Sequence, residues 1–256
     1  MLGMVLTPFL TIRFGIPGML LIYGIAAAIA AILFFLAARE RPPSPPCPPD
    51  QDERSLVLDG LKQIVRTRDF VLLMVIFFVG LGVFNSVTTW IEDIVRPRGF
   101  SITQAGLIGG LMILGGIVGA LFLPTWSDRS RRRVPFMILA LGGATVGLAG
   151  ITFATSYGLL LTSAFALGFF LLAAGPIGFQ YGAEVTYPAP EGTSNGLLLV
   201  MGQIAGIAFI LAMDLLKSPE TGSMSLSLVI LIVLMLLGLF LCTRLRESSL
   251  MAGDGD

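Results

Sequence analysis

Long apolar runs separated by short polar segments dominate the chain. Each run holds about 20 residues, the length that a helix needs to cross the hydrocarbon core of a bilayer. Residues 1–12 are apolar but too short to cross alone, so we expect either a buried half-span or the tail of a helix whose beginning is missing. A Gly- and Pro-containing turn follows at residues 13–18. The pattern predicts an all-α, polytopic membrane protein with seven full spans, at 16–38, 70–91, 104–125, 134–154, 157–181, 194–215 and 226–243.

The polar segment after the first full span divides the chain. Residues 41–49 are rich in proline, which favours a stiff extended linker, and a charged stretch follows at residues 50–54. Apolar residues then recur on one face of a short helix that would lie along the membrane surface, namely Leu56, Leu58, Leu61, Ile64 and Val65. We therefore expect four parts: the end of one bundle at 1–38, a cytoplasmic linker at 39–68, a six-helix bundle at 69–246 and a tail at 247–256.

Glycines recur one helical turn apart in two of the spans, as Gly106, Gly110, Gly115 and Gly119 in one and as Gly202 and Gly206 in the other. Such positions let helix backbones approach closely in lipid. We expect ordinary helix packing there, with sliding during a conformational cycle as the alternative. The faces of Gly115, Gly119, Gly202 and Gly206 are expected to meet helices outside this chain.

Composition narrows the classes of function. Hydrophobic residues make up 55% of the chain and charged residues 12%, which excludes a soluble domain. Histidine is absent, so the commonest metal ligand and the usual general base are both lacking. We expect neither an enzyme nor a metal site or cofactor, and no nucleic-acid partner.

The basic residues are distributed unevenly between the two sides of the predicted membrane. Four of the 16 lie on one side (Arg13, Arg96, Arg98 and Lys217), and the other twelve lie on the side of the proline-rich linker. The positive-inside rule places the basic side in the cytoplasm. The chain is therefore expected in the cell membrane, plasma or inner, with its C-terminus cytoplasmic.

A basic segment between two spans carries a motif. In Trp126-Ser127-Asp128-Arg129-Ser130-Arg131-Arg132-Arg133 a single acid precedes a run of arginines. The segment could be only a solvated basic loop, but Asp128, Arg129, Arg132 and Arg133 resemble the motif of the major facilitator superfamily between helices 8 and 9, with Pro124 where glycine is usual. The resemblance implies a cytoplasmic gate in which a basic residue pairs with Glu184 and Asp128 approaches a helix start.

The helix start in question follows a polar hairpin loop. The hydroxyls of Thr193 and Ser194 suit an N-cap, and Glu191 lies just before them in the loop. The sequence Glu184-Val185-Thr186-Tyr187-Pro188, with Glu191-Gly192-Thr193-Ser194 and Gln203, is similar to the feline leukaemia virus subgroup C receptor-related transporters, a branch associated with choline, ethanolamine and haem transport. By this resemblance the chain is the C-terminal portion of a transporter, from the end of helix 5 to helix 12. Its partners would be membrane lipid, a solute and the missing N-terminal helices.

The candidate solute site comes from polar residues within spans. Gln203 lies about 13 Å into its predicted helix, where an amide needs a partner. The role of Gln203 could be purely structural, as an interhelical hydrogen bond, but the resemblance implies that it contacts the solute. Asn85, Thr89 and Trp90 make another span polar, and Gln180 completes the candidate set.

Choline-carrying members have tyrosine about where Asn85 stands and tend to have glutamate where Gln180 stands. Because both residues differ here, the expected solute is not narrowed to choline, and two classes stay open: an organic cation and a neutral metabolite. The expected function is transport of a small organic solute by alternating access. A non-transporting sensor or scaffold that binds partners through residues 39–68 is the alternative.

Overall fold

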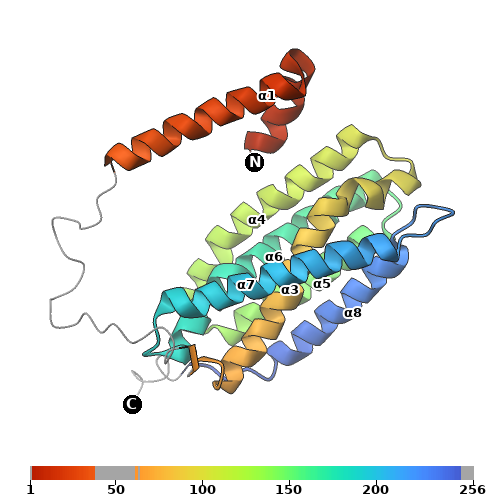
Figure 1. The fold of residues 1–256 in the computed structure, drawn as a ribbon. Helices are drawn as coiled ribbons and strands as arrows, with labels where there is room; N and C mark the ends of the chain where they lie inside the picture. Colours follow the sequence, from red (N-terminus) through yellow and green to blue (C-terminus); the bar gives the residue numbers. More distant parts are fainter. Residues whose placement is uncertain (1, 38–60, 63, 249–256) are drawn as a thin grey trace. The chain divides into compact units, whose positions relative to one another are not determined.

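The computed structural model describes residues 2–37, 61–62 and 64–248 of the chain (Figure 1). The chain divides into two units, Met1–Arg54 and Ser55–Asp256. In the first unit, helix α1 (Leu2–Ala37) is interrupted at Gly15, where φ is 68° and ψ is 174°. This left-handed residue confirms the expected turn, and the part from Arg13 to Ala37 is long and apolar enough to span a membrane.

The second unit is an antiparallel helical bundle. Its elements are α3 (Arg68–Val95), the 3₁₀ turn η2 (Arg96–Arg98), α4 (Ile102–Ser130), α5 (Val134–Phe153), α6 (Tyr157–Thr186), α7 (Glu191–Leu215) and α8 (Ser225–Cys242). With α1, seven helices in the described residues are long and apolar enough to cross a bilayer. All seven predicted spans and the all-α membrane fold are therefore confirmed.

Several helices extend beyond the predicted spans. Helix α4 continues through Pro124 to Ser130, α6 continues to Thr186, and α7 begins at Glu191. The length of an apolar run reflects the thickness of the hydrocarbon core, whereas the backbone hydrogen bonds of the helix continue through polar turns outside that core. The motif residues Asp128 and Arg129 therefore belong to the last turn of α4, and the loop before α5 is only residues 131–133.

The predicted N-cap at Thr193 and Ser194 is wrong. The N-cap residue of α7 is Pro190, whose carbonyl accepts from the amides of Thr193 (3.0 Å) and Ser194 (3.3 Å). The Ser194 hydroxyl is buried inside the first turn and donates to the carbonyl of Glu191 at 3.0 Å. A proline has no amide hydrogen to leave unpaired, so it suits the residue before a helix, and Glu191 adds favourable charge to the first turn.

Helix α6 occupies the centre of the bundle and packs against α4 and α5, while α3 packs against α7 and α8. The loops place the start of α3, the end of α4, the start of α5, the end of α6, the start of α7 and the end of α8 together. We call this the basic end, and the other the far end. One apolar core cluster lies toward each end, with Tyr181 and Phe70 fully buried in the cluster of the basic end.

Glycines set the spacing between helices. A Cβ atom at Gly119 would lie 1.9 Å from the carbonyl oxygen of Phe169, and one at Gly168 would lie 1.8 Å from that of Met112, so α4 and α6 touch backbone to backbone. Gly115 also packs on the backbone of Phe165 of α6, whereas Gly202 and Gly206 pack on the side chains of Leu81 and Asn85 of α3.

The expectation that these faces meet helices outside the chain is therefore wrong, because helices of the same bundle fill them. Gly106 and Gly110 have no such neighbour within 4 Å.

Parts of the expected linker and tail belong to the bundle. Ile64 is fully buried in the core of the basic end, but Val65 is 46% exposed, so the apolar face predicted for the surface helix does not include it. Leu56 and Leu58 lie outside the described residues. Ser248, which was assigned to the tail, is 3% exposed.

At the far end, Arg98 ties two helices together. Its guanidinium donates to the backbone carbonyls of Ile151 (2.6 Å), Thr152 (2.9 Å) and Ala154 (3.3 Å). These carbonyls lie at the C-terminus of α5, where a cation complements the helix dipole. The contact joins η2 to the end of α5.

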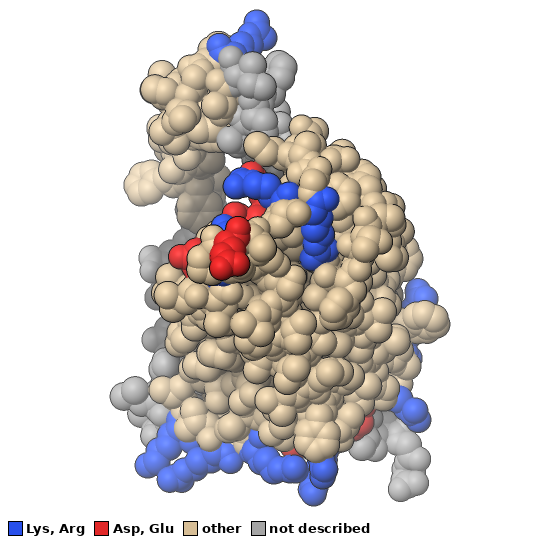
Figure 2. Space-filling model, turned by 90° about the vertical axis from the view of Figure 1, so that its right-hand side faces the viewer, with Lys and Arg blue, Asp and Glu red and all other residues tan. Residues whose placement is uncertain are grey.

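Charge gathers at the two ends of the bundle. Of the basic residues between 61 and 248, Arg96, Arg98 and Lys217 lie at the far end and the other nine at the basic end. The space-filling view has Lys and Arg gathered along its lower edge, a mixed acidic and basic group above, and a broad uncharged surface between them (Figure 2). A surface with charge only at its ends suits a bilayer.

Gly168→Ala should lower the free energy of unfolding by about 1–3 kcal/mol, because a methyl group there would force α4 and α6 apart. Gly110→Ala, in open space on α4, is the matched control and should leave stability unchanged or slightly raised. Thermal unfolding of both variants in detergent measures the difference. Equal midpoints would contradict the close packing.

Candidate functional site

A tight turn after α4 directs Arg133 into the bundle. Arg131 adopts a left-handed conformation (φ 50°), its amide bonds to the carbonyl of Asp128 at 3.2 Å, and the amide of Arg132 bonds to that of Ser127 at 3.3 Å. This pair of bonds is a Schellman motif that closes the helix. The Ser127 hydroxyl also donates to the carbonyl of Arg132 at 2.6 Å, which fixes the chain immediately before Arg133.

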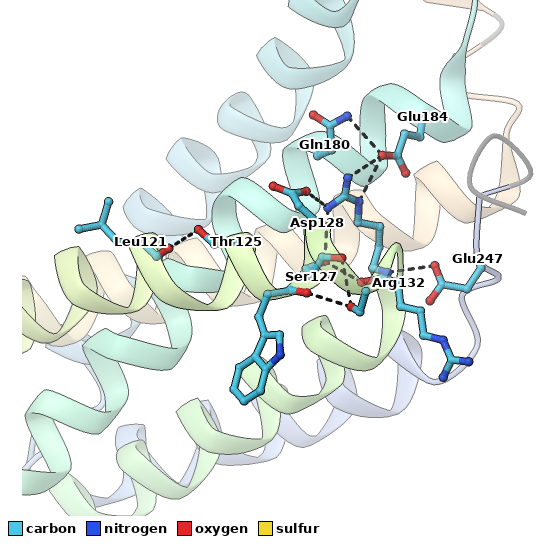
Figure 3. A network of polar contacts seen from close by, with 11 residues as sticks. Leu121, Thr125, Ser127, Asp128, Arg132, Gln180, Glu184 and Glu247 are labelled. Atoms are coloured by element: carbon cyan, nitrogen blue, oxygen red, sulfur yellow. Dashed lines mark hydrogen bonds and ion pairs between the residues drawn. The ribbon is translucent and has the colours of Figure 1, made fainter. Parts of the chain in front are cut away.

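Arg133 is the centre of a group that we call the ion cluster, made of Asp128, Arg133 and Glu184. Its Nη1 donates to the carboxylate of Asp128, while Nε and Nη2 donate to Oε1 of Glu184 at 3.2 and 3.1 Å. The side chains of Arg133 and Glu184 are 4% and 7% exposed, and that of Asp128 is 62% exposed. The cluster joins the end of α4, the start of α5 and the end of α6 (Figure 3).

The electrostatics keep Arg133 charged despite its burial. Burial alone lowers the pKa of its guanidinium, but hydrogen bonds and charge from Asp128 and Glu184 raise that pKa above its ordinary value. Such a pair is held in place strongly, because removing one partner leaves an uncompensated buried charge.

The contact of Asp128 with the helix start is not found. Within the described residues, the Asp128 carboxylate pairs with Arg133 and makes no hydrogen bond to residues 191–196. Arg129 and Arg132 have exposed side chains, and so does Glu191. Of the predicted arginines, only Arg133 is buried against Glu184.

Two members of this region could not be recognised in the sequence. Glu247 accepts hydrogen bonds from the backbone amides of Arg133 (3.1 Å) and Val134 (3.0 Å), and thereby caps α5. Ser127 contacts Arg133 Nη1 at 3.4 Å as well as the carbonyl of Arg132. Both act on backbone or on a single side-chain atom, which leaves no residue pattern to detect.

A second candidate region lies where α3 meets α7. Asn85 is half-buried and lies over Gly206, so that a Cβ atom there would be 2.9 Å from Asn85 Nδ2. Gln203 is exposed one turn earlier on α7. Neither amide side chain hydrogen-bonds to another described residue.

The remaining polar residues of α3 are largely satisfied within the bundle. The hydroxyls of Ser86, Thr88 and Thr89 donate to carbonyls one turn back in the same helix, at 2.6, 2.6 and 2.7 Å. Trp90 donates to the carbonyl of Ile210 on α7 at 3.1 Å. Their polarity is thus compatible with packing, and Trp90 ties α3 to α7.

Gln180 is held apart from this region. Its side chain donates to Glu184 Oε1 at 3.2 Å, which places it beside the ion cluster (Figure 3). The structure therefore brings Asn85 and Trp90 to the α3–α7 contact, leaves Thr89 and Gln203 exposed on those two helices, and brings Gln180 to the basic end.

No residues are assigned to a metal or a cofactor. In the part of the chain that the structure describes, no three His, Cys, Asp or Glu side chains are grouped so as to hold a metal ion. A pocket between α3, α5 and α6 is lined only by apolar residues, among them Phe77, Phe84 and Leu171. It offers no partner to a charged group.

The all-α membrane fold agrees with a comparison against known proteins. Residues 1–210 match the family described as the Major Facilitator Superfamily. The chain belongs to this superfamily of membrane transporters. Membership argues against an enzyme.

Individual relatives lie in the same branch that the hairpin resembles. The chain is 32% identical to the solute carrier family 49 member A3 of Xenopus tropicalis over 213 residues, which cover 80% of this chain and 44% of that protein. It is 32% identical to the choline/ethanolamine transporter FLVCR1 of Mus musculus over 225 residues, 80% of this chain and 39% of that one. An uncharacterized protein of Archaeoglobus fulgidus is 30% identical over 205 residues, 78% of this chain and 89% of that one. The match thus spans less than half of either vertebrate relative.

Arg133→Gln should lower the free energy of unfolding by about 3 kcal/mol, because Glu184 would remain buried without its cation. Arg132→Gln, at the exposed neighbour, is the matched control and should change it by less than about 0.5 kcal/mol. Thermal or denaturant unfolding in detergent measures both. Equal losses would mean that the cluster contributes nothing specific.

Proposed function

We propose that the chain forms part of a transporter that moves a small organic solute across the cell membrane. The observation that carries the proposal is a pair of amide side chains in a chain that belongs to a transporter superfamily: Asn85 at the α3–α7 contact and Gln203, exposed on α7, neither with a hydrogen-bond partner among the described residues. A polar side chain within a span is costly unless it has a partner or faces water, and so marks a solute path. Trp90 lies at the same contact, and Thr89 is exposed one residue before it.

The proposed mechanism is alternating access between two bundles around this site. The bundle formed by α3 to α8 is one of them, and residues 1–38 would end the other. The ion cluster would form this bundle's side of the gate at the basic end, because its contacts hold the ends of α4 and α6 together within the bundle. Arg129, Arg132 and Glu191, together with the first turn of α7 at Thr193 and Ser194, would border the gate.

The proposed solute is an organic cation or a neutral metabolite. The candidate site offers amides, a hydroxyl and the indole of Trp90, but no acidic group. Amides bind uncharged polar groups, and an aromatic ring attracts a cation weakly. The mouse relative is a choline/ethanolamine transporter, which makes these two solutes the first to test.

The scaffold alternative depends on residues 39–68. Most of that segment lies outside the described residues, and superfamily membership favours transport. A scaffold has no need for unsatisfied amides on α3 and α7, so solute binding separates the two functions.

Titration of the purified chain in nanodiscs with choline and ethanolamine should give saturable binding for at least one of them, measured by scintillation proximity with radiolabelled solute. Gln203→Ala should weaken that binding about tenfold, because a buried polar group of the solute loses its partner. Ile207→Ala, which is exposed one turn further along α7, is the matched control.

Unchanged solute binding in Gln203→Ala would mean that Gln203 does not belong to the solute site. Absence of binding by the unmodified chain would remove both named solutes. Liposomes that contain the chain alone are expected to accumulate no solute, because alternating access needs a second bundle. Accumulation of solute in these liposomes would support transport as the function but contradict the two-bundle mechanism.

The orientation is tested by labelling with an impermeant thiol reagent. In a background in which Cys47 is serine, a cysteine replacing Glu220 at the far end should react from outside intact cells. One replacing Gly192 at the basic end should react only after the membrane is made permeable, because the excess of basic residues keeps that end in the cytoplasm. The reverse pattern would invert the topology.

A further inference from the structure

The residues that follow α8 are packed against the bundle. The amides of Arg244 and Leu245 bond to the carbonyls of Leu241 (3.0 Å) and Cys242 (3.2 Å), so the chain turns back directly after the helix. Leu245 is 7% exposed and Ser248 is 3% exposed. We call residues 243–248 the strap, because the segment crosses the basic end in contact with two other helices.

The first contact of the strap is with the residue at the centre of the ion cluster. Both carboxylate oxygens of Glu247 accept backbone amides, Oε2 from Arg133 at 3.1 Å and Oε1 from Val134 at 3.0 Å. Figure 3 shows Glu247 beside the turn that ends in Arg132. A carboxylate that holds two amides at a helix start makes charge-assisted bonds and complements the helix dipole. It fixes the backbone from which the Arg133 side chain extends.

The second contact is with the helix that carries the other half of the buried ion pair. The hydroxyl of Tyr181, which is fully buried on α6, donates to the carbonyl of Arg246 at 2.7 Å. Tyr181 precedes Glu184 by three residues, which puts the two side chains on neighbouring parts of one helix face. The two successive residues Arg246 and Glu247 therefore hold both sides of the Arg133–Glu184 pair.

We infer that Glu247 is a positioning residue for the ion cluster, and that the strap controls how readily the basic end opens. The strap sets the separation of α5 and α6 at the place where the guanidinium must reach Glu184 Oε1. A buried pair in which two guanidinium nitrogens share one carboxylate oxygen tolerates little displacement, because its energy depends on geometry and on exclusion of water. Release of the strap weakens the ion pair without removing either charge.

A simpler role has to be separated from this one. If Glu247 only caps α5, its loss affects the first turn of that helix and nothing beyond it. If it positions Arg133, its loss also loosens the hairpin between α6 and α7 at residues 184–194, which lies beyond Glu184 in the chain and makes no contact with Glu247 among the described hydrogen bonds.

Hydrogen exchange followed by mass spectrometry, on the full 256-residue chain in nanodiscs, tests the inference. Glu247→Ala should speed exchange about tenfold at residues 133–137 through loss of the amide bonds. It should also speed exchange at residues 184–194, but by less than Arg133→Gln does, because both charges of the ion pair remain. The variant that carries both substitutions should exchange no faster in that hairpin than Arg133→Gln alone, because the contact that Glu247 positions is then already lost.

Two further variants keep the test decisive. Glu247→Gln retains one acceptor oxygen and should give a smaller change in the same two segments, which serves if Glu247→Ala folds poorly. Glu220→Ala removes an exposed carboxylate at the far end and should change neither segment.

Faster exchange confined to residues 133–137 would overturn the inference and leave Glu247 a simple cap. Additive effects in the double variant would overturn it as well. The inference rests on the proposed gate. The hydrogen-exchange result does not depend on whether the chain transports a solute, so the inference and the proposed function can fail separately.

Discussion

The buried charge of Arg133 is the constraint on which the basic end of this bundle depends. A guanidinium removed from water is tolerated only while carboxylates and hydrogen bonds replace the solvent. Asp128 supplies one contact from α4, and Glu184 supplies two from α6. Because the partners come from different helices, satisfying one side chain fixes three helix ends at once. Any motion that separates α4 from α6 at this end must expose or rehydrate the charge.

The same two helices are also held by backbone contact deeper in the membrane. Gly119 and Gly168 let carbonyl oxygens approach where a methyl group would overlap them. Dispersion between closely packed backbones replaces the hydrophobic drive that lipid cannot provide. The interior of the bundle is thus fixed by shape and its basic end by charge. Only the second kind of contact can be made and broken without repacking the apolar interior.

The sequence predicts the membrane spans and part of the ion cluster, but it does not predict the helix ends or the contacts of Glu247 and Gln180. Spans follow from apolar length, because bilayer thickness dictates it, and the pairing of the motif with Glu184 follows from family resemblance. Helices α4 and α6 end at Ser130 and Thr186, and α7 begins at Glu191, all beyond the apolar residues, because helical backbone hydrogen bonds continue through the polar turns. Glu247 could not be predicted, because it binds backbone amides that every residue carries. The position of Gln180 beside Glu184 depends on a rotamer that spacing does not determine.

The two polar regions differ in a way that matches different tasks. At the basic end Asp128, Arg133, Gln180 and Glu184 are joined by hydrogen bonds, whereas the side chains of Asn85 and Gln203 form none to the described residues. Satisfied groups stabilise one conformation, and unsatisfied groups within a span are stabilised by something that binds there or by water. Trp90 and Lys217 hold α3 to α7 at the far end, through Ile210 and Asp93. Ionic contacts therefore occur at both ends of the bundle, but those of the ion cluster hold a buried arginine, so a change there alters the solvation of a charge as well as the position of helix ends.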